Sequence, residues 1–144
     1  MKELIKFENI KVKVEAKDWK EAIEIVGNLL LVSGKIKEGY IESMIKAVID
    51  MGPYIVITPG LALAHAQPSS DVIENGVSII NLKSPVNFGS ANDPVNVVLC
   101  LACTDTDSHI NVLQSVAEKL MIEGMIERLA SCDNEQQIYS LINE

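Results

Sequence analysis

Two side chains in this sequence of 144 residues have an ordinary pKa near neutrality, and they are His65 and His109. His65 ends the apolar run Leu61–Ala64, in which Leu61 and Leu63 share its face, and it precedes the strand breaker Gln67-Pro68. We therefore expect it where a strand meets a loop, a rigid place from which an imidazole can act as a nucleophile or a base. On position alone, the simpler interpretation is a core histidine satisfied by one hydrogen bond.

His109 follows the segment Thr104–Ser108, which is dense in residues that cap helices. We expect it in the first turn of a helix that is capped near Asp107. The positive end of a helix disfavours an imidazolium, whereas Asp105 and Asp107 favour it, so the direction of its pKa shift stays open. Local evidence alone favours a surface residue over a ligand.

The three cysteines include Cys100 and Cys103, which have the C-x-x-C spacing of a redox pair. They lie in the apolar run Val95–Cys103, which predicts a buried strand, and strand positions three apart face opposite sides of a sheet. We therefore expect buried, free thiols in place of a redox pair. Two histidines without a third ligand predict no metal site. The sequence also lacks the glycine motifs for nucleotides, so we expect no cofactor.

Periodicity divides the chain into helices and short strands. Helices are expected from the capping box Asp18–Glu21 to Ser33-Gly34, from Lys37 to Gly52-Pro53, after Thr104–Ser108, and after Asn134. Strands are expected at Ile10–Val14, Val77–Leu82 and Val95–Ala102, with two more inside Tyr54–His65 around Thr58-Pro59-Gly60. Ser84-Pro85 is expected to end the strand Val77–Leu82.

These elements predict one α/β domain over residues 1–144, in which helices cover a mixed sheet. The absence of helices between the strands from Ile55 to Ala102 disfavours a purely parallel sheet. With a net charge of −8, the chain is a poor partner for nucleic acids and anionic membranes. No apolar run approaches the roughly 18 residues of a membrane span, and no signal peptide is evident, so we expect a cytoplasmic protein.

The segment Gly52–His65 resembles the enzyme IIA component of the sugar phosphotransferase system (PTS), of the mannitol–fructose class. Together with the segments Asn92–Val98 and Thr104–His109, it is most similar to the L-ascorbate-specific subgroup. The resemblance extends from Trp19 through the last helix. It implies a PTS enzyme IIA type 2 domain with the fold of a three-layer α/β/α sandwich around a mixed β-sheet.

The resemblance also implies a phosphorelay. The phosphocarrier protein HPr would transfer a phosphoryl group to His65, which would pass it to a cysteine of a cognate enzyme IIB. A membrane enzyme IIC would couple this transfer to the uptake of L-ascorbate or a related sugar. In the family pattern a second histidine lies beside the acceptor, and His109 matches that position, where it could stabilise the phosphoryl group.

Two departures from the family pattern affect the phosphate-binding residues. Ala64 stands where many members have proline, and the second helix lacks the arginine that many members carry near the site. Lys46 lies in that region, and the single arginine, Arg128, is far along the chain. We therefore expect His109 and backbone N–H groups to stabilise the phosphoryl group. Because the net charge repels a phosphorylated donor, we expect docking on an apolar patch around His65, with Leu61, Leu63 and the residues after Gln67 as candidates.

Two other functions remain open at this point. An enzyme IIA-like domain can act as a regulator that binds targets according to its phosphorylation state. Alternatively, the chain could be a small binding module with structural histidines, and it would then take up no phosphoryl group.

Overall fold

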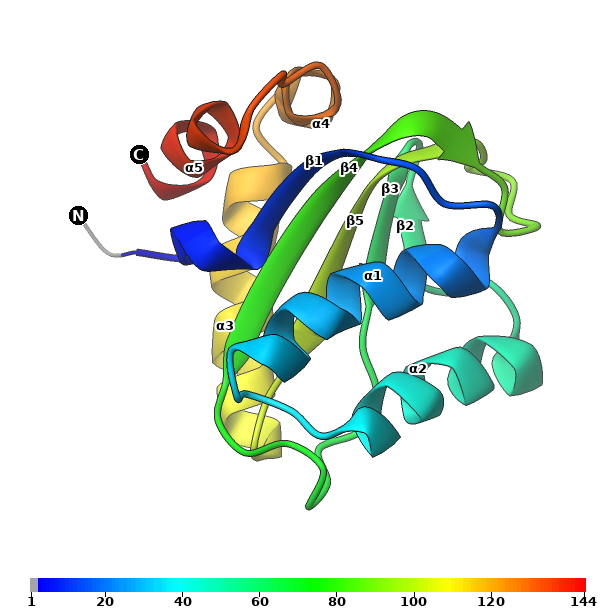
Figure 1. The fold of residues 1–144 in the computed structure, drawn as a ribbon, viewed down its shortest axis with the longest axis vertical. Coiled ribbons are helices and arrows are strands. Elements are labelled where there is room, and N and C mark those ends of the chain that lie inside the picture. Colours follow the sequence, from blue (N-terminus) through cyan, green and yellow to red (C-terminus); the bar gives the residue numbers. More distant parts are fainter. Residues whose placement is uncertain (1–2) are drawn as a thin grey trace.

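The computed structural model describes residues 3–144, which form a five-stranded sheet between two layers of helices (Figure 1). The strand order is β1-β4-β5-β3-β2. The pairs β1–β4 and β3–β5 are parallel, whereas β2–β3 and β4–β5 are antiparallel, which confirms the predicted mixed sheet. The strands are β1 (Ile10–Val14), β2 (Val56–Thr58), β3 (Leu61–Ala64), β4 (Gly76–Val86) and β5 (Val95–Ala102).

Helices cover both faces of this sheet. They are α1 (Trp19–Val32), α2 (Glu38–Met51), α3 (Thr106–Leu120), α4 (Met125–Ala130) and α5 (Glu135–Asn143), and a short 3₁₀ turn, η1 (Phe7–Asn9), precedes β1. Residues Ala62 and Ala64 of β3 pack toward α1 and α2, and Leu61 and Leu63 pack toward α3, α4 and α5. This alternation confirms the three-layer α/β/α sandwich.

Side-chain caps begin three of the helices. Asp18 accepts a hydrogen bond from the Glu21 N–H at 2.9 Å, and Asn134 accepts one from the Gln137 N–H at 3.0 Å, as the sequence predicts. The cap of α3 is Asp105, which accepts from Ser108 N–H at 2.7 Å. The predicted cap near Asp107 is wrong by two residues, because Asp105 has the extended backbone of a cap and Asp107 is already helical.

The strand β4 is longer than the sequence predicts. It continues through Pro85 to Val86, although Ser84-Pro85 was expected to end it near Leu82. On one side of β4, its partner strand β1 ends opposite Leu82. On the other side, the pairing of β4 with β5 shifts register between Asn81 and Val86. The N–H that Pro85 lacks therefore falls where the ladder is already interrupted, which is a position that tolerates proline.

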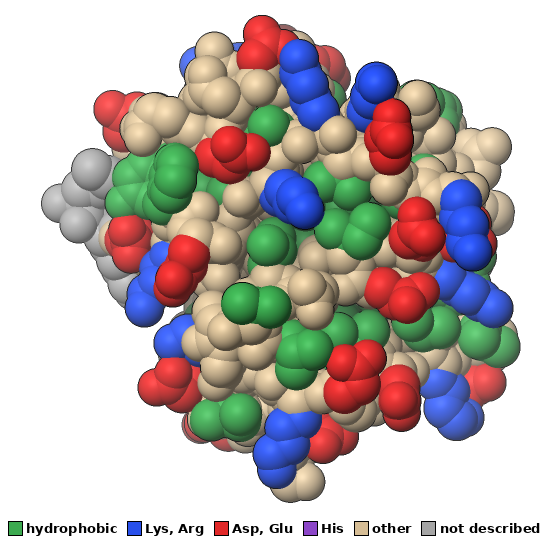
Figure 2. Space-filling view, viewed as in Figure 1, with side chains coloured by type: hydrophobic (Ala, Val, Ile, Leu, Met, Phe, Trp, Pro, Cys, Tyr) green, Lys and Arg blue, Asp and Glu red, His purple; other side chains and the backbone are tan. Residues whose placement is uncertain are grey.

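A close approach of two helices sets the place of α2 on the sheet. A Cβ atom at Gly27 of α1 would lie 2.8 Å from Cγ1 of Ile41 in α2, so glycine is needed at this crossing. Acidic, basic and apolar side chains are interspersed over the face that these two helices form (Figure 2). Within residues 3–144, no helix combines the length and the apolar character that a membrane crossing requires.

Candidate functional site

The site lies where the parallel neighbours β3 and β5 leave the sheet at the same edge. The pairing of these strands ends with Ala64 opposite Cys100. His65 follows Ala64 directly, and the chain after β5 turns into α3, whose first turn carries His109. The two imidazole rings, distant in sequence, thereby lie with their centroids 5.7 Å apart and their planes inclined by 48°.

The orientation of His65 is fixed by a hydrogen bond to its own strand. The ring Nδ1 lies 2.8 Å from the carbonyl oxygen of Leu63. A carbonyl oxygen can only accept, so Nδ1 carries the proton of the neutral ring and Nε2 keeps the lone pair. Tyr54 packs edge-on against the same ring, at 5.6 Å between centroids and an interplanar angle of 84°. His65 makes the one hydrogen bond of the simpler interpretation, but it is partly exposed and lines a cleft, so it is not a core histidine.

His109 has an environment that favours its neutral form. Burial lowers the pKa of its ring below the ordinary value, and the nearby His65 lowers it further. The structure thus gives a direction to the pKa shift that the sequence left open. The Nδ1 atom of His109 is buried and has no hydrogen-bond partner among the described residues. A buried polar atom of this kind is available to a group that enters the site.

Both histidines line a cleft of about 610 Å³. Three parts of the chain line this cleft: one side of α2 together with Tyr54, the segment 65–69 that follows β3, and the start of α3 at Thr106. His65, His109 and the N-terminus of α3 therefore border the same cleft. A helix N-terminus offers unpaired N–H groups and a positive dipole end, which are suited to an anion.

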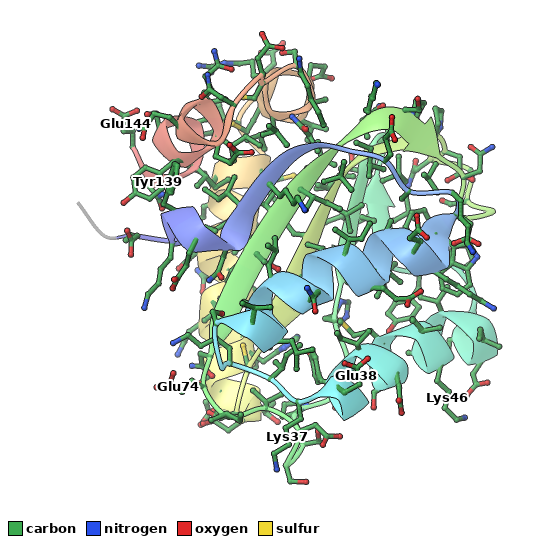
Figure 3. The ribbon with its side chains drawn as sticks, in the orientation of Figure 1. Lys37, Glu38, Lys46, Glu74, Tyr139 and Glu144 are labelled. Carbon is green, nitrogen blue, oxygen red and sulfur yellow. The ribbon has the colours of Figure 1, made fainter. Side chains whose placement is uncertain are left out.

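The cationic residue of the cleft is Lys46 of α2. In the part of the chain that the structure describes, it is the only lysine or arginine that lines this cleft. Its ammonium lies 2.7 Å from a carboxylate oxygen of Asp50, which raises the pKa of Lys46, and it points away from the sheet (Figure 3). Arg128 lines a different hollow, beside Cys132 and α5.

The prediction that Leu61 and Leu63 form part of a docking surface is wrong, whereas Pro68 and Ser69, which follow Gln67, line the cleft. The two leucines are 0% and 2% exposed, because α3, α4 and α5 cover their face of the sheet. The apolar side chains that are accessible at the cleft are Met51 and Tyr54, with 66% and 41% exposed. Sequence reasoning missed them, since Met51 falls in the apolar stripe of α2 and was therefore expected to be buried.

The cysteines lie apart from this chemistry. Cys100, Cys103 and Cys132 are free and buried. Cys100 faces α2, where it contacts Met44, whereas Cys103 belongs to the opposite core, so the predicted divergence of the C-x-x-C pair is confirmed. Burial raises the pKa of Cys100 to about 12 and that of Cys103 to about 11. Across residues 3–144, no group of three or more His, Cys, Asp or Glu is arranged to hold a metal ion.

Comparison with known proteins gives one family. The family described as "Phosphoenolpyruvate-dependent sugar phosphotransferase system, EIIA 2" matches residues 3–144. The mannitol-specific cryptic phosphotransferase enzyme IIA component of Escherichia coli (strain K12) is 34% identical over 94% of this chain and 92% of its own length. The ascorbate-specific PTS system EIIA component of the same strain is 33% identical over 94% of this chain and 89% of its own. These identities do not separate the two sugar classes.

Solved structures share the fold. The solution structure of the mannitol-specific cryptic enzyme IIA from Escherichia coli has a TM-score of 0.89 and 33% identity, and the match covers 98% of both chains. The enzyme IIA of the complex between Escherichia coli mannitol enzyme IIA and phosphorylated mannitol enzyme IIB has a TM-score of 0.82 and 25% identity, over 94% of both chains.

Proposed function

We propose that this chain carries a phosphoryl group on Nε2 of His65. The chain belongs to the EIIA type 2 family of the phosphoenolpyruvate-dependent sugar phosphotransferase system and is thus a phosphotransferase relay component. The observation that carries this proposal is the hydrogen bond from Nδ1 to the Leu63 carbonyl oxygen. It turns one ring nitrogen to the backbone and leaves the other with its lone pair, in a residue that lines an open cleft.

The transfer has two steps in which bonds balance. The lone pair of His65 Nε2 forms a bond to phosphorus as the bond between phosphorus and the histidine of phospho-HPr breaks, and its electron pair leaves with the HPr ring. The Nδ1 proton remains on His65, where the Leu63 carbonyl stabilises the positive charge of the ring. A thiolate of enzyme IIB then attacks phosphorus, and Nε2 recovers its electron pair.

Positioning and charge stabilisation supply most of the catalysis in phosphoryl transfer. Three groups that border the cleft can serve here, namely the ring of His109, the first N–H groups of α3 near Thr106, and the ammonium of Lys46. Lys46 is a point charge on a flexible stem, so it lacks the two-pronged geometry of an arginine. We therefore assign most of the stabilisation to His109 and the helix start.

The proposed partners follow from the relatives. The mannitol enzyme IIA has been solved in complex with phosphorylated enzyme IIB, so a cognate enzyme IIB is the proposed acceptor for this chain. HPr is the proposed donor in the cytoplasm, and a membrane enzyme IIC is the proposed final member of the relay. For the sugar we propose L-ascorbate or a related sugar, with mannitol as the competing choice because one relative carries that specificity.

A labelling experiment tests the acceptor. Purified enzyme I, HPr and ³²P-labelled phosphoenolpyruvate are expected to label this protein once, in a bond that is labile in acid and stable in base. His65→Ala is expected to abolish the label, whereas His109→Ala is expected to keep it. Label that persists in His65→Ala, or a folded parent protein that takes up none, would contradict the proposal.

The labelled protein then tests the sugar class. It is mixed with purified enzyme IIB proteins of the ascorbate and the mannitol type, and the rate of loss of label from His65 is compared. Faster transfer to the ascorbate type is the expected result. A labelled protein that delivers to no enzyme IIB would favour the regulatory alternative over transport.

A further inference from the structure

The hydroxyl of Tyr40 connects the two chain segments that lead to the histidines. Tyr40 lies in the first turn of α2 and is 1% exposed. Its hydroxyl donates to the carbonyl oxygen of Leu101 at 2.7 Å and accepts a hydrogen bond from the N–H of Ala66 at 3.0 Å. One oxygen atom thus bridges the end of β5 and the residue after His65.

This bridge begins where the strand pairing stops. The parallel ladder of β3 and β5 runs from Leu61 opposite Val97 to Ala64 opposite Cys100. Beyond that pair the two backbones separate, and the Tyr40 hydroxyl stands between the next available N–H and C=O groups. The tyrosine thereby satisfies both backbone groups at the carboxyl ends of the two strands, which is where α/β sheets open to ligands.

His65 is held between two fixed points as a result. On one side, the Leu63 N–H donates to the Ile55 carbonyl oxygen at 2.8 Å, and the Leu63 carbonyl receives Nδ1 of His65. On the other side, Ala66 is tied to Tyr40. Leu101, the second partner of Tyr40, lies near the end of β5, so the same hydroxyl also bonds the strand that leads to α3 and His109.

We propose that Tyr40 is a positioning residue, whose hydroxyl holds open the fork between β3 and β5 and thereby fixes the ring orientation of His65 and its distance from His109. Burial raises the pKa of Tyr40, so the hydroxyl stays protonated at every pH used to assay phosphoryl transfer. The phosphoryl-transfer part of this inference rests on the proposed function of His65, whereas the positioning part does not.

Tyr40→Phe keeps the aromatic packing and removes the bridging oxygen. Ser78→Ala is a matched control, because Ser78 is also fully buried and its hydroxyl also donates to a backbone carbonyl, that of Val26, at 2.7 Å. Tyr40→Phe loses the two hydrogen bonds of the bridging oxygen and Ser78→Ala loses one buried hydrogen bond, but only Tyr40→Phe is expected to loosen the fork. Circular dichroism and thermal melting are used to choose a temperature at which parent and variants are all folded.

Two measurements are made on the three proteins. Long-range ¹H–¹⁵N NMR of the unphosphorylated protein reports the tautomer of His65, and Tyr40→Phe is expected to lose the predominance of the Nδ1–H form that parent and Ser78→Ala show. Transfer from phospho-HPr is expected to slow about tenfold or more in Tyr40→Phe, since small misplacements of a reacting group have effects of this order. Ser78→Ala is expected to stay within about twofold of the parent, as a change that leaves the reacting geometry intact.

A parent-like His65 tautomer in Tyr40→Phe overturns the inference, and so does a transfer rate that matches the parent or an equal slowing in Ser78→Ala. These failures differ from failure of the proposed function, in which the folded parent itself takes up no phosphoryl group. In that event the NMR comparison alone decides whether Tyr40 positions His65.

Discussion

The ring centroids of His65 and His109 lie 5.7 Å apart, yet the Nδ1 atoms of the two rings differ in their hydrogen bonding. Nδ1 of His65 is committed to the Leu63 carbonyl, whereas Nδ1 of His109 is buried without a partner among the residues described. The first ring is therefore held in one tautomer, and the second can present an N–H donor without first breaking a bond to the protein. This asymmetry is consistent with the proposed roles of His65 as phosphoryl acceptor and His109 as stabilising donor.

Removal of the His109 ring is expected to slow transfer and leave the fold intact. His109→Ala deletes a donor that would bond a phosphoryl oxygen, and loss of one such donor lowers rates by about a hundredfold in comparable sites. Single-turnover rates from phospho-HPr, and onward to enzyme IIB, check this expectation. His109→Gln, which keeps an N–H donor of similar reach, is expected to retain more activity than His109→Ala. A rate of phosphoryl transfer in His109→Ala equal to that of the parent would show that His109 does not contribute to the site.

Phosphorylation of His65 is expected to raise the pKa of His109. In the free protein burial and the neighbouring His65 hold this pKa below its ordinary value, whereas a phosphoryl group of roughly −1.5 to −2 charge would favour the imidazolium. Titration of the His109 ring by ¹H NMR, before and after phosphorylation, measures the shift. An unchanged or lower pKa in the phosphorylated protein would place the phosphoryl group away from His109.

The same lowered pKa gives the free protein a pH-dependent stability. Between the pKa of folded His109 and the ordinary value of 6.5, the unfolded chain binds more protons at this ring than the folded chain does. The stabilisation that neutral His109 contributes is fully present above the pKa of its ring in the unfolded chain. It is lost as the pH falls through the lower pKa of the ring in the folded protein. Urea unfolding at several pH values, for the parent and His109→Gln, is expected to show a smaller loss of stability in the variant on acidification.

Lys46 is expected to contribute to the rate through its charge. Lys46→Met should slow transfer severalfold, and more so at low salt, because the phosphoryl group loses a cation that borders the cleft. Lys83→Met is the matched control, since Lys83 also forms an exposed ion pair, with Glu15 at 3.1 Å, but does not line the cleft. Equal rates in these two variants, over a range of salt concentrations, would show that Lys46 plays no part.

The three cysteines are expected to be unreactive in the folded protein. Burial raises the pKa of all three thiols, so little thiolate forms near neutral pH. A thiol reagent such as DTNB should label them only after denaturation, and reductant should not change the melting temperature. Glu24→Cys, at an exposed position of α1, supplies a fast-reacting reference. A disulfide between Cys100 and Cys103 in the folded protein would contradict the geometry.

Local patterns in the sequence predicted most of the sandwich. Alternation over Ile10–Val14 and the caps at Asp18 and Asn134 depend on neighbours within a few residues, and the structure has each of these elements in the predicted place. The α4 helix was missed, because six residues are too few for a helical period to be visible in the sequence.

Relationships between distant segments could not be predicted in the same way. Alternation put Leu61 and Leu63 on the face of His65, but it gave no information on which helices cover that face, and α3 buries them. The bridge through the Tyr40 side chain joins backbone groups of two other segments, at Leu101 and Ala66, and backbone groups leave no trace in side-chain types. The pairing of His65 with His109 was expected only from the family resemblance, and their spacing came from the fold.

The continuation of β4 past Leu82 has a consequence for the behaviour of the protein at high concentration. Since β1 ends there, the last residues of β4 form an open margin of the sheet, the kind of surface on which strands of other molecules can add. Pro85 offers no N–H to an incoming strand. The exposed ion pair of Lys83 and Glu15 places two charged, hydrated side chains at that margin. We therefore expect the proline that interrupts the sequence pattern to disfavour strand addition at this margin.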